Sequence, residues 1–230
     1  MTPDTLMAAM EATWPPAASW GLGPWQMRDG AGGGKRVSAA TLAGPWQPQD
    51  IALAEAAMPQ PLFMIRPQDA ELDTALAARG YAVVDPVIGY VVDTAGFVAA
   101  PHMATFPHWP PLRIAADLWE AAGIGPARLA VMDRAAGPKT VILARTTDRA
   151  VGVAFVALHG STAMLHALEV QPRHRRQGTA RHILAAAAVW ARGQGADRLA
   201  LVVTVANTAA RALYASQGMQ AVGQYHYRQK

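Results

Sequence analysis

The chain has 230 residues, of which 52% are hydrophobic and 16% are charged, and its formal net charge is +4. This composition is typical of a packed core, and the charge is too small for a dedicated nucleic-acid binder. Because cysteine is absent, disulfides, thiol catalysis and cysteine-bound zinc are excluded. The N-terminus has no basic region before an apolar run, and the longest apolar run, residues 183–191, is too short for a membrane span. We therefore expect a soluble cytoplasmic protein.

The first half of the chain alternates between short helical and strand-like segments. Its glycine-rich stretch, residues 30–34, predicts the turn of a hairpin between strands within 20–30 and 35–43. Residues 81–93 are strand-like, with an expected break at Pro86. The other expected elements are helices over 4–13, 48–58 and 69–80 and a strand over 61–66.

Residues 94–111 contain four prolines and no periodic apolar pattern. They predict a linker, residues 96–111, between an N-terminal domain over 1–95 and a C-terminal domain over 112–230. In the C-terminal domain we expect helices over 112–122, 125–135, 178–193 and 207–218, and strands over 139–146, 150–160, 162–170, 198–205 and 219–228. The helix over 178–193 has one apolar face, formed by Ile183, Leu184, Ala187, Ala188 and Ala191.

A weak internal repeat connects the two halves. The segments "LDTALAARGYAVV" and "ARALYASQGMQAV" each contain a helix of small residues, a glycine and a strand, and each follows an apolar strand. Aligning Gly80 with Gly218 places Leu76 opposite Tyr214. The halves are either copies of one unit or two ordinary helix–glycine–strand units, and the sequence leaves both interpretations open.

The stretch "VQPRHRRQGTARHILAAAA", residues 170–188, runs from a strand into a helix. The first N–H groups of a helix have no partner within it, and the helix dipole favours an anion there. Gly178 lets a phosphate approach the backbone, and the arginines add charge-assisted contacts. The pattern predicts a pyrophosphate site that is neither a P-loop nor a dinucleotide-binding fingerprint. The competing interpretations are a solvated basic turn and a nucleic-acid patch.

These residues resemble the acyl-CoA-binding signature of the GNAT N-acyltransferases. The signature Arg/Gln-x-x-Gly-x-Gly/Ala reads Arg175-Arg176-Gln177-Gly178-Thr179-Ala180 here. A second GNAT signature, an Asn that opens a helix carrying Ala-x-x-Leu-Tyr before a glycine, appears as Asn207, Ala210, Leu213, Tyr214 and Gly218. The resemblance covers about residues 110–230. It implies an α/β (α+β) fold with a mixed, mostly antiparallel central sheet flanked by helices, in two tandem GNAT-like halves if the repeat is real.

The resemblance also implies roles for individual residues. The backbone of Leu168, Glu169 and Val170 would bond the pantetheine arm of acetyl-CoA like an added strand. Asn207 would contact the same arm, and Tyr214 would protonate the departing thiolate. Backbone amides and side chains around the pyrophosphate would come from Arg175, Arg176, Gln177, Gly178, Thr179, Ala180 and Arg181.

The general base is expected on the strand that precedes the loop. His166 is one candidate, because several family members have a histidine or glutamate there that faces the substrate. By strand alternation His166 shares a face with Leu168 and Val170, unless a bulge alters it. Glu169 is the second candidate, and a water chain is the third.

The expected activity is transfer of an acetyl group from acetyl-CoA to the primary amine of a small-molecule or peptide acceptor in a ternary complex. The alternative is an acyl-CoA-binding sensor without turnover. The first half has no phosphate-binding motif, so it would cap the sheet, shape the acceptor site or form a dimer surface. Tyr225 and Tyr227 alternate on the last strand, where one face could touch substrate. No metal, nucleic acid or membrane is expected as a partner, and a homodimer remains open.

Overall fold

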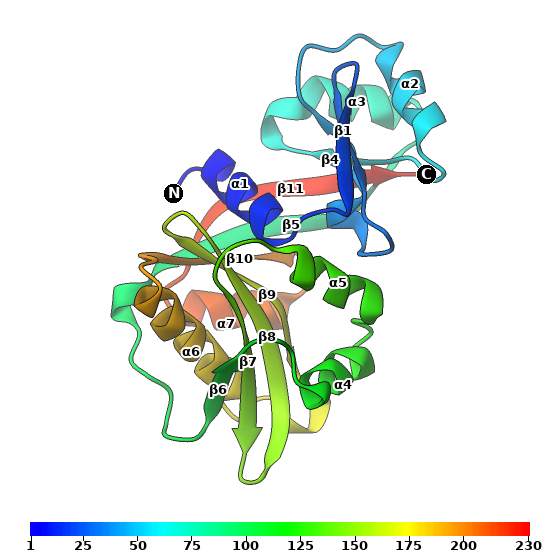
Figure 1. Cartoon of the computed structure of the whole chain (residues 1–230). Coiled ribbons are helices and arrows are strands. Elements are labelled where there is room, and N and C mark those ends of the chain that lie inside the picture. Colours follow the sequence, from blue (N-terminus) through cyan, green and yellow to red (C-terminus); the bar gives the residue numbers. More distant parts are fainter.

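The computed structural model describes all residues, 1–230, and shows an eight-stranded sheet that runs through two lobes (Figure 1). Its strand order is β4-β11-β5-β10-β9-β8-β7-β6, and the pair β9–β10 is parallel while every other pair is antiparallel. The strands are β4 (Leu62–Ile65), β5 (Ala82–Asp93), β6 (Thr105–His108), β7 (Lys139–Thr146), β8 (Arg149–His159), β9 (Thr162–Val170), β10 (Arg198–Thr204) and β11 (Gln220–Gln229). The expected mixed, mostly antiparallel sheet is confirmed.

A smaller three-stranded sheet lies in the N-terminal lobe. It consists of β1 (Ala18–Leu22), β2 (Trp25–Asp29) and β3 (Thr41–Leu42). A single parallel bridge between Ala40 and Phe63 connects it to β4 of the large sheet. The two sheets therefore share backbone hydrogen bonds as well as a core.

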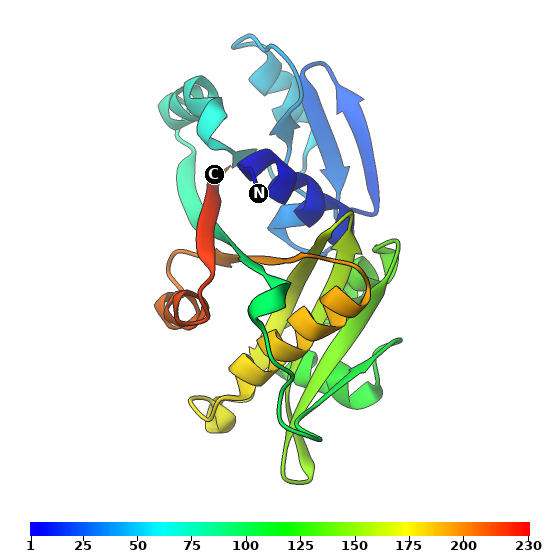
Figure 2. The same cartoon turned by 90° about the vertical axis from the view of Figure 1, so that its left-hand side faces the viewer.

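Helices cover both faces of the large sheet. The helices are α1 (Pro3–Thr13), α2 (Asp50–Ala57), α3 (Ala70–Ala78), α4 (Arg113–Ala121), α5 (Pro126–Arg134), α6 (Thr179–Gly193) and α7 (Thr208–Ser216). Side chains of α6 and α7 pack into one core cluster, and those of α4 and α5 pack into a cluster on the opposite face. Helix α1 contacts β8, β9 and β11, and α6 crosses the sheet in Figure 2. No helix is long and apolar enough to cross a membrane.

The apolar face predicted for α6 is confirmed. Its five predicted side chains are all fully buried against the sheet. Three of the five are alanines, and small side chains allow the helix to approach closely. The approach is close at β8, where a Cβ added to Gly152 would lie 3.1 Å from side-chain atoms of both Thr179 and Ile183. This contact fixes the first turn of α6 against the sheet.

The predicted pairing of strands within 20–30 and 35–43 is present as the antiparallel pair β2–β3, with Trp25 opposite Leu42. A tight turn through Gly23 and Pro24, which was not expected, joins β1 to β2, with Leu22 opposite Trp25. The glycine-rich stretch 30–34 instead packs against α5, where a Cβ added to Gly33 would lie 2.5 Å from the Val131 side chain. Its glycines thus provide a close approach rather than a strand turn, and a 3-10 turn over Lys35–Val37 follows.

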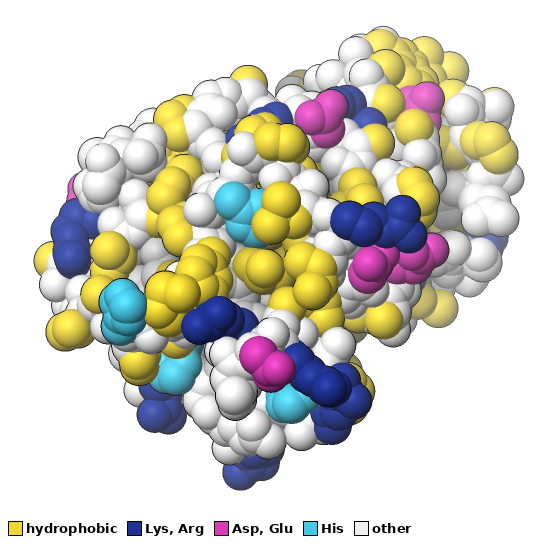
Figure 3. Space-filling model, turned by 60° about the horizontal axis from the view of Figure 1, so that its bottom comes forward, with side chains coloured by type: hydrophobic (Ala, Val, Ile, Leu, Met, Phe, Trp, Pro, Cys, Tyr) yellow, Lys and Arg dark blue, Asp and Glu magenta, His cyan; other side chains and the backbone are white.

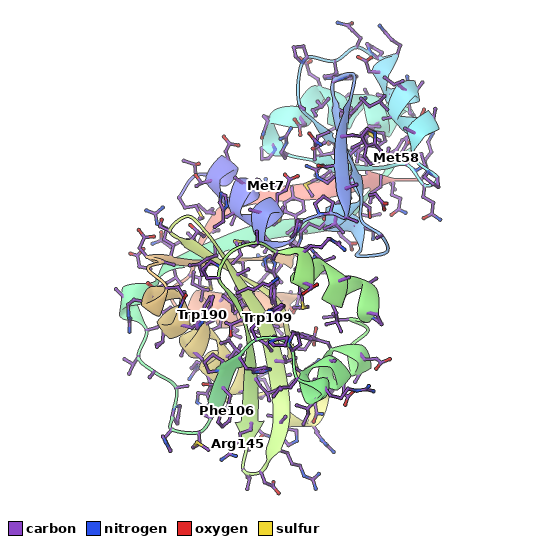
Figure 4. All side chains as sticks on the ribbon, viewed as in Figure 1. Met7, Met58, Phe106, Trp109, Arg145 and Trp190 are labelled. Carbon is purple, nitrogen blue, oxygen red and sulfur yellow. The ribbon has the colours of Figure 1, made fainter.

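The expected linker contains one further strand. Strand β6 pairs with β7 at the edge of the large sheet, and the Arg145 guanidinium lies 5.4 Å from the centre of the Phe106 ring (Figure 4). Pro107 sits within this strand, which is tolerated at a sheet edge. Strand β5, from the N-terminal side, pairs with both β10 and β11. Division into domains over 1–95 and 112–230 stays a prediction, since one sheet spans the boundary.

Four strands of the large sheet obey an approximate two-fold symmetry. The unit β4–α3–β5 and the unit β10–α7–β11 each insert their last strand beside the other unit, which gives the order β4-β11-β5-β10 (Figure 1). Gly80 and Gly218 end the two helices with φ of 83° and 76°. Shifting every residue by the interval between these glycines maps strand pairs onto one another: Val91–Gln220 onto Gln229–Ala82, Tyr90–Leu201 onto Arg228–Phe63, and Ile88–Val203 onto His226–Ile65. This register favours duplication over chance.

Candidate functional site

Strands β9 and β10 separate in the middle of the large sheet. They pair from Thr162 to Leu165 on β9 and from Arg198 to Leu201 on β10, and not beyond. A bulge then shifts the pairing of β9 with β8, and Ala167 takes a positive φ of 50°. The C-terminal part of β9 therefore has an edge without a partner strand, and two pockets meet at this gap.

The first pocket, the loop pocket, has a volume of about 600 Å³. Its walls are the end of β9, residues 174–176 and 178–181, and helix α7. Ten predicted residues line it: Leu168, Glu169, Val170, Arg175, Arg176, Gly178, Thr179, Ala180, Arg181 and Asn207. Tyr214 also lines it, so the structure brings both predicted motifs to one pocket. Gln177 does not line it, and its side-chain amide donates to the carbonyl of Arg173.

The backbone of the loop presents six consecutive N–H groups that have no acceptor in the protein. These are the amides of residues 176–181, which precede the first α6 hydrogen bond, from His182 N–H to the Gly178 carbonyl at 3.0 Å. Arg176 and Gly178 adopt positive φ of 63° and 85°. Successive free N–H groups at a helix N-terminus form an anion-binding site. Gly178 is required for its backbone conformation, since a Cβ there would approach nothing closer than 3.9 Å.

The loop arginines surround these amides with positive charge. Arg175 donates from Nε to the Val170 carbonyl at 3.0 Å and lies 3.9 Å from the Glu169 carboxylate. Arg176 and Arg181 are exposed and form no ion pair within the protein. On the face drawn in Figure 3, Lys and Arg side chains lie among Asp and Glu side chains and form no continuous basic patch.

Asn207 and Tyr214 are held by helix α7. The Asn207 side chain caps the helix, with Oδ1 accepting from the Ala210 N–H at 3.1 Å. Tyr214 is buried about two turns further along the helix, with its ring centre 5.9 Å from that of Tyr90. Burial, followed by the charge of Glu169, raises the pKa of Tyr214 to about 12. The phenol therefore stays protonated and able to donate across the physiological pH range.

The second pocket has a volume of about 390 Å³ on the other side of the gap, and we call it the acceptor pocket after the acceptor expected from the sequence. It shares Leu168, Asn207 and Tyr214 with the loop pocket. Its remaining walls come from strands β5 and β9–β11, from Ile124 and Arg128 at α5, and from Trp14 and residues 33–36 of the N-terminal lobe. Tyr225 and Tyr227, which alternate along the last strand, both line it. A ligand in each pocket would meet the other beside Tyr214.

His166 lies on the opposite face of the sheet from Leu168 and Val170, so the facing expected from strand alternation is wrong. The bulge at Ala167 adds a residue and inverts the alternation. Leu168 and Val170 pack toward α6, whereas the His166 ring lies 5.0 Å from Trp14 and 6.1 Å from Phe155. His166 reaches the acceptor pocket from this face.

Both ring nitrogens of His166 are engaged. Its Nδ1 is 3.2 Å from Nη1 of Arg36, which can only donate, so Nδ1 accepts. Its Nε2 then donates to the Thr13 hydroxyl at 2.9 Å, and that hydroxyl donates to the Ala9 carbonyl. Burial, and secondarily the Arg36 charge, hold the pKa of His166 well below its usual value. His166 is thus a neutral acceptor of a hydrogen bond from a cation.

Acid is expected to destabilise the fold through His166. Its pKa is lowered in the folded state, so stability present above the ordinary histidine pKa, about 6.5, is lost as the pH falls below it. The unfolding free energy should fall by up to about 1.4 kcal/mol per pH unit there. Chemical denaturation between pH 7 and 5 measures this slope. His166→Gln should flatten it and the exposed His159→Gln should not; equal slopes in both would contradict the assignment.

Several residues in the acceptor pocket or in contact with its lining carry no sequence signal. Arg36, Trp14 and Thr13 belong to the first half, where no motif marks them, and Arg128 lies on an ordinary amphipathic helix. Only the suggestion that the first half shapes the acceptor site pointed toward this region. No group of three or more His, Asp or Glu side chains is arranged to hold a metal ion.

Comparisons with known proteins identify the family and the fold. The model of the Acetyltransferase (GNAT) family matches residues 103–219. A GCN5-related N-acetyltransferase from Kribbella flavida has a similar structure, with a TM-score of 0.68, 16% identity and coverage of 99% of this chain and 95% of that one. No curated protein has a significant similarity to this sequence.

Two further solved structures have the same fold. One is a GNAT-family acetyltransferase from Novosphingobium aromaticivorans, with a TM-score of 0.63, 13% identity and coverage of 98% and 94%. The other is a tandem GNAT protein from the clavulanic acid biosynthesis pathway, with a TM-score of 0.58, 14% identity and coverage of 94% and 84%. These likenesses show the fold, and the family match covers half of the residues. The chain belongs to the GNAT acetyltransferase family.

Proposed function

We propose that the protein transfers the acetyl group of acetyl-CoA to a primary amine. One observation carries this proposal: six unpaired amides over residues 176–181 border a pocket that meets a second pocket where β9 and β10 separate. The amides suit a pyrophosphate, and the unpaired edge of β9 suits the amide groups of a pantetheine arm. The thioester would then reach the gap, with the amine approaching from the acceptor pocket.

The reaction is direct transfer between the two ligands. The amine nitrogen attacks the thioester carbonyl carbon, a C–N bond forms, and the C–S bond breaks with its electron pair on sulfur. The ammonium proton passes to a base, and the thiolate takes a proton from an acid. Two properties support Tyr214 as the acid: it lines both pockets, and its raised pKa keeps the hydroxyl protonated.

Glu169 is the better-supported base of the two candidates. Both nitrogens of His166 already form hydrogen bonds, so a proton could enter only after one of them breaks. Glu169 is half-buried, and its carboxylate approaches a single cation, Arg175, at 3.9 Å. Burial raises the pKa of Glu169, although Arg175 and Arg128 oppose the shift. Because Glu169 lines the loop pocket, it would receive the amine proton through a water molecule.

The pH dependence of turnover tests Glu169. In the wild type, kcat/KM should rise with pH through the raised pKa of this carboxyl. Glu169→Gln should lower kcat by about a hundredfold and remove that limb, because an amide cannot accept the proton. The exposed Glu120→Gln variant should keep the wild-type profile. A Glu169→Gln variant that retains the limb would exclude Glu169 as the base.

Two measurements on the purified protein test the activity itself. Calorimetric titration with acetyl-CoA measures binding, and a thiol-reactive dye measures CoA release with amines of different classes. We expect saturable binding and release that requires an amine. Binding without release for any amine would favour an acyl-CoA sensor, and absence of binding would overturn the proposal.

A further inference from the structure

The acceptor pocket has an excess of positive charge. Its charged lining residues are Lys35, Arg36, Arg128 and Asp85. Lys35 and Asp85 neutralise one another in an ion pair of 2.6 Å. Neither Arg36 nor Arg128 has a carboxylate partner within the protein. Two unpaired guanidinium groups therefore face a pocket that is expected to receive a cationic or neutral amine.

Arg36 is the more deeply placed of the two. Its Nε atom is inaccessible to solvent and has no hydrogen-bond partner. Its Nη1 donates to neutral His166, and the guanidinium lies 5.8 Å from the centre of the Trp14 ring. An arginine cannot lose its proton in a protein, and a buried charge is costly unless it is paired. The neutral histidine orients this cation without neutralising it.

Arg128 contributes from the rim. It projects from α5 onto residues 33–34, where a Cβ added to Gly34 would lie 3.5 Å from its Nη2 atom. Gly34 has a φ of 98°, so the glycine-rich loop is shaped to accommodate both the chain and this side chain. Two segments distant in sequence thus bring positive charge to one pocket.

We propose that the acetyl acceptor carries an anionic group that pairs with Arg36, so that amino carboxylates such as amino acids are the substrate class. This inference rests on the proposed acetyl transfer. Beyond the N–H group donated to His166, the Arg36 guanidinium has further N–H donors, which can bind a carboxylate through charge-assisted hydrogen bonds. The amine of the same molecule would then point toward Tyr214 and the gap. A phosphate has the same charge chemistry, and the test separates the two anions.

Matched acceptors test the inference on the wild-type protein. The probes are the L-amino acids, their C-terminal amides and the corresponding decarboxylated amines, with phosphoethanolamine and ethanolamine as the phosphate pair. CoA release gives kcat/KM for each. At least one amino acid should exceed its amide and its decarboxylated amine by about ten- to a hundredfold. The amine of an amino acid amide is less basic than that of the amino acid, so at neutral pH more of it is in the reactive neutral form. A difference in free amine would therefore favour the amide, which is the opposite of the expected preference.

The outcomes separate the inference from the activity. Equal turnover of amines with and without an anionic group would overturn the anionic acceptor and leave acetyl transfer intact. If acetyl-CoA binds but none of the amines causes CoA release, the proposed function would instead be overturned. A preference for phosphoethanolamine over every amino acid would keep the anionic acceptor and overturn the carboxylate.

Arg36→Met tests the residue assigned to the anion. It should remove the preference for the charged acceptor through a rise in KM of about ten- to a hundredfold, with acetyl-CoA affinity unchanged. Arg134→Met is the matched control, because Arg134 also has a buried Nε without a partner but lines neither pocket. Preference retained in Arg36→Met would exclude this pairing. His166→Gln should weaken the preference less, as expected of a positioning residue.

Discussion

Gly178→Glu is expected to lower the affinity for acetyl-CoA by at least about a hundredfold. Two effects act together at this position. The new carboxylate would enter a ring of six unpaired amides and repel a pyrophosphate. Gly178 also has a φ of 85°, which side chains rarely adopt, so the loop would strain or rearrange. Calorimetric titration with acetyl-CoA measures the loss.

Two variants separate charge from backbone strain. Gly195 lies just beyond the other end of α6 with a φ of 88°, and a Cβ there meets nothing within 4 Å. Gly195→Glu should therefore lose similar stability but keep its affinity, since Gly195 lines neither pocket. Gly178→Ala adds the strain without the charge and should have an intermediate effect. Wild-type affinity in Gly178→Glu would show that the pyrophosphate binds elsewhere.

The loop pocket could be predicted from the sequence because its determinants are local. The junction of β9 and α6, the glycine at 178 and the Asn cap of α7 each depend on residues within one helical turn. The apolar face of α6 follows from helical spacing alone. Local patterns of this kind are readable before the fold is known.

The acceptor pocket could not be predicted in the same way. Its most informative contact joins Arg36 to His166 across 130 positions, and strand alternation gave His166 the wrong face. The bulge at Ala167 depends on how β9 meets β8, which the sequence of β9 does not encode by itself. The glycine-rich stretch 30–34 has turn chemistry, yet packing against α5 determines its conformation.

The internal repeat shows a similar division. The helix–glycine–strand pattern is visible in the sequence, but the insertion of β11 between β4 and β5 is a tertiary event. In the first half the position of Tyr214 is taken by Leu76, which is fully buried with Trp25 and Phe63. That half has a core residue at the position where the second half has the tyrosine that lines both pockets. It contributes instead to the wall of the acceptor pocket, through Arg36.

Tyr214→Phe is expected to lower kcat by about a hundred- to a thousandfold and to leave acetyl-CoA affinity within about twofold of wild type. The ring stays in place in this variant, so the packing of α7 on Tyr90 is retained. Only the hydroxyl that would protonate the thiolate is lost. Since the pKa of Tyr214 is about 12, the wild-type rate should show no loss from tyrosine ionisation below pH 10. CoA release and calorimetry together measure the two quantities.

Tyr90→Phe is the matched control for this substitution. Tyr90 belongs to the same core cluster and is equally buried, but it lines neither pocket. Its variant should keep kcat, and both variants should unfold at similar temperatures. If Tyr214→Phe retained full turnover, the thiolate would have to take its proton from another donor, such as water. If neither wild type nor variant turned over any amine while both bound acetyl-CoA, the pocket would serve binding alone, because the acid would then have no reaction to assist.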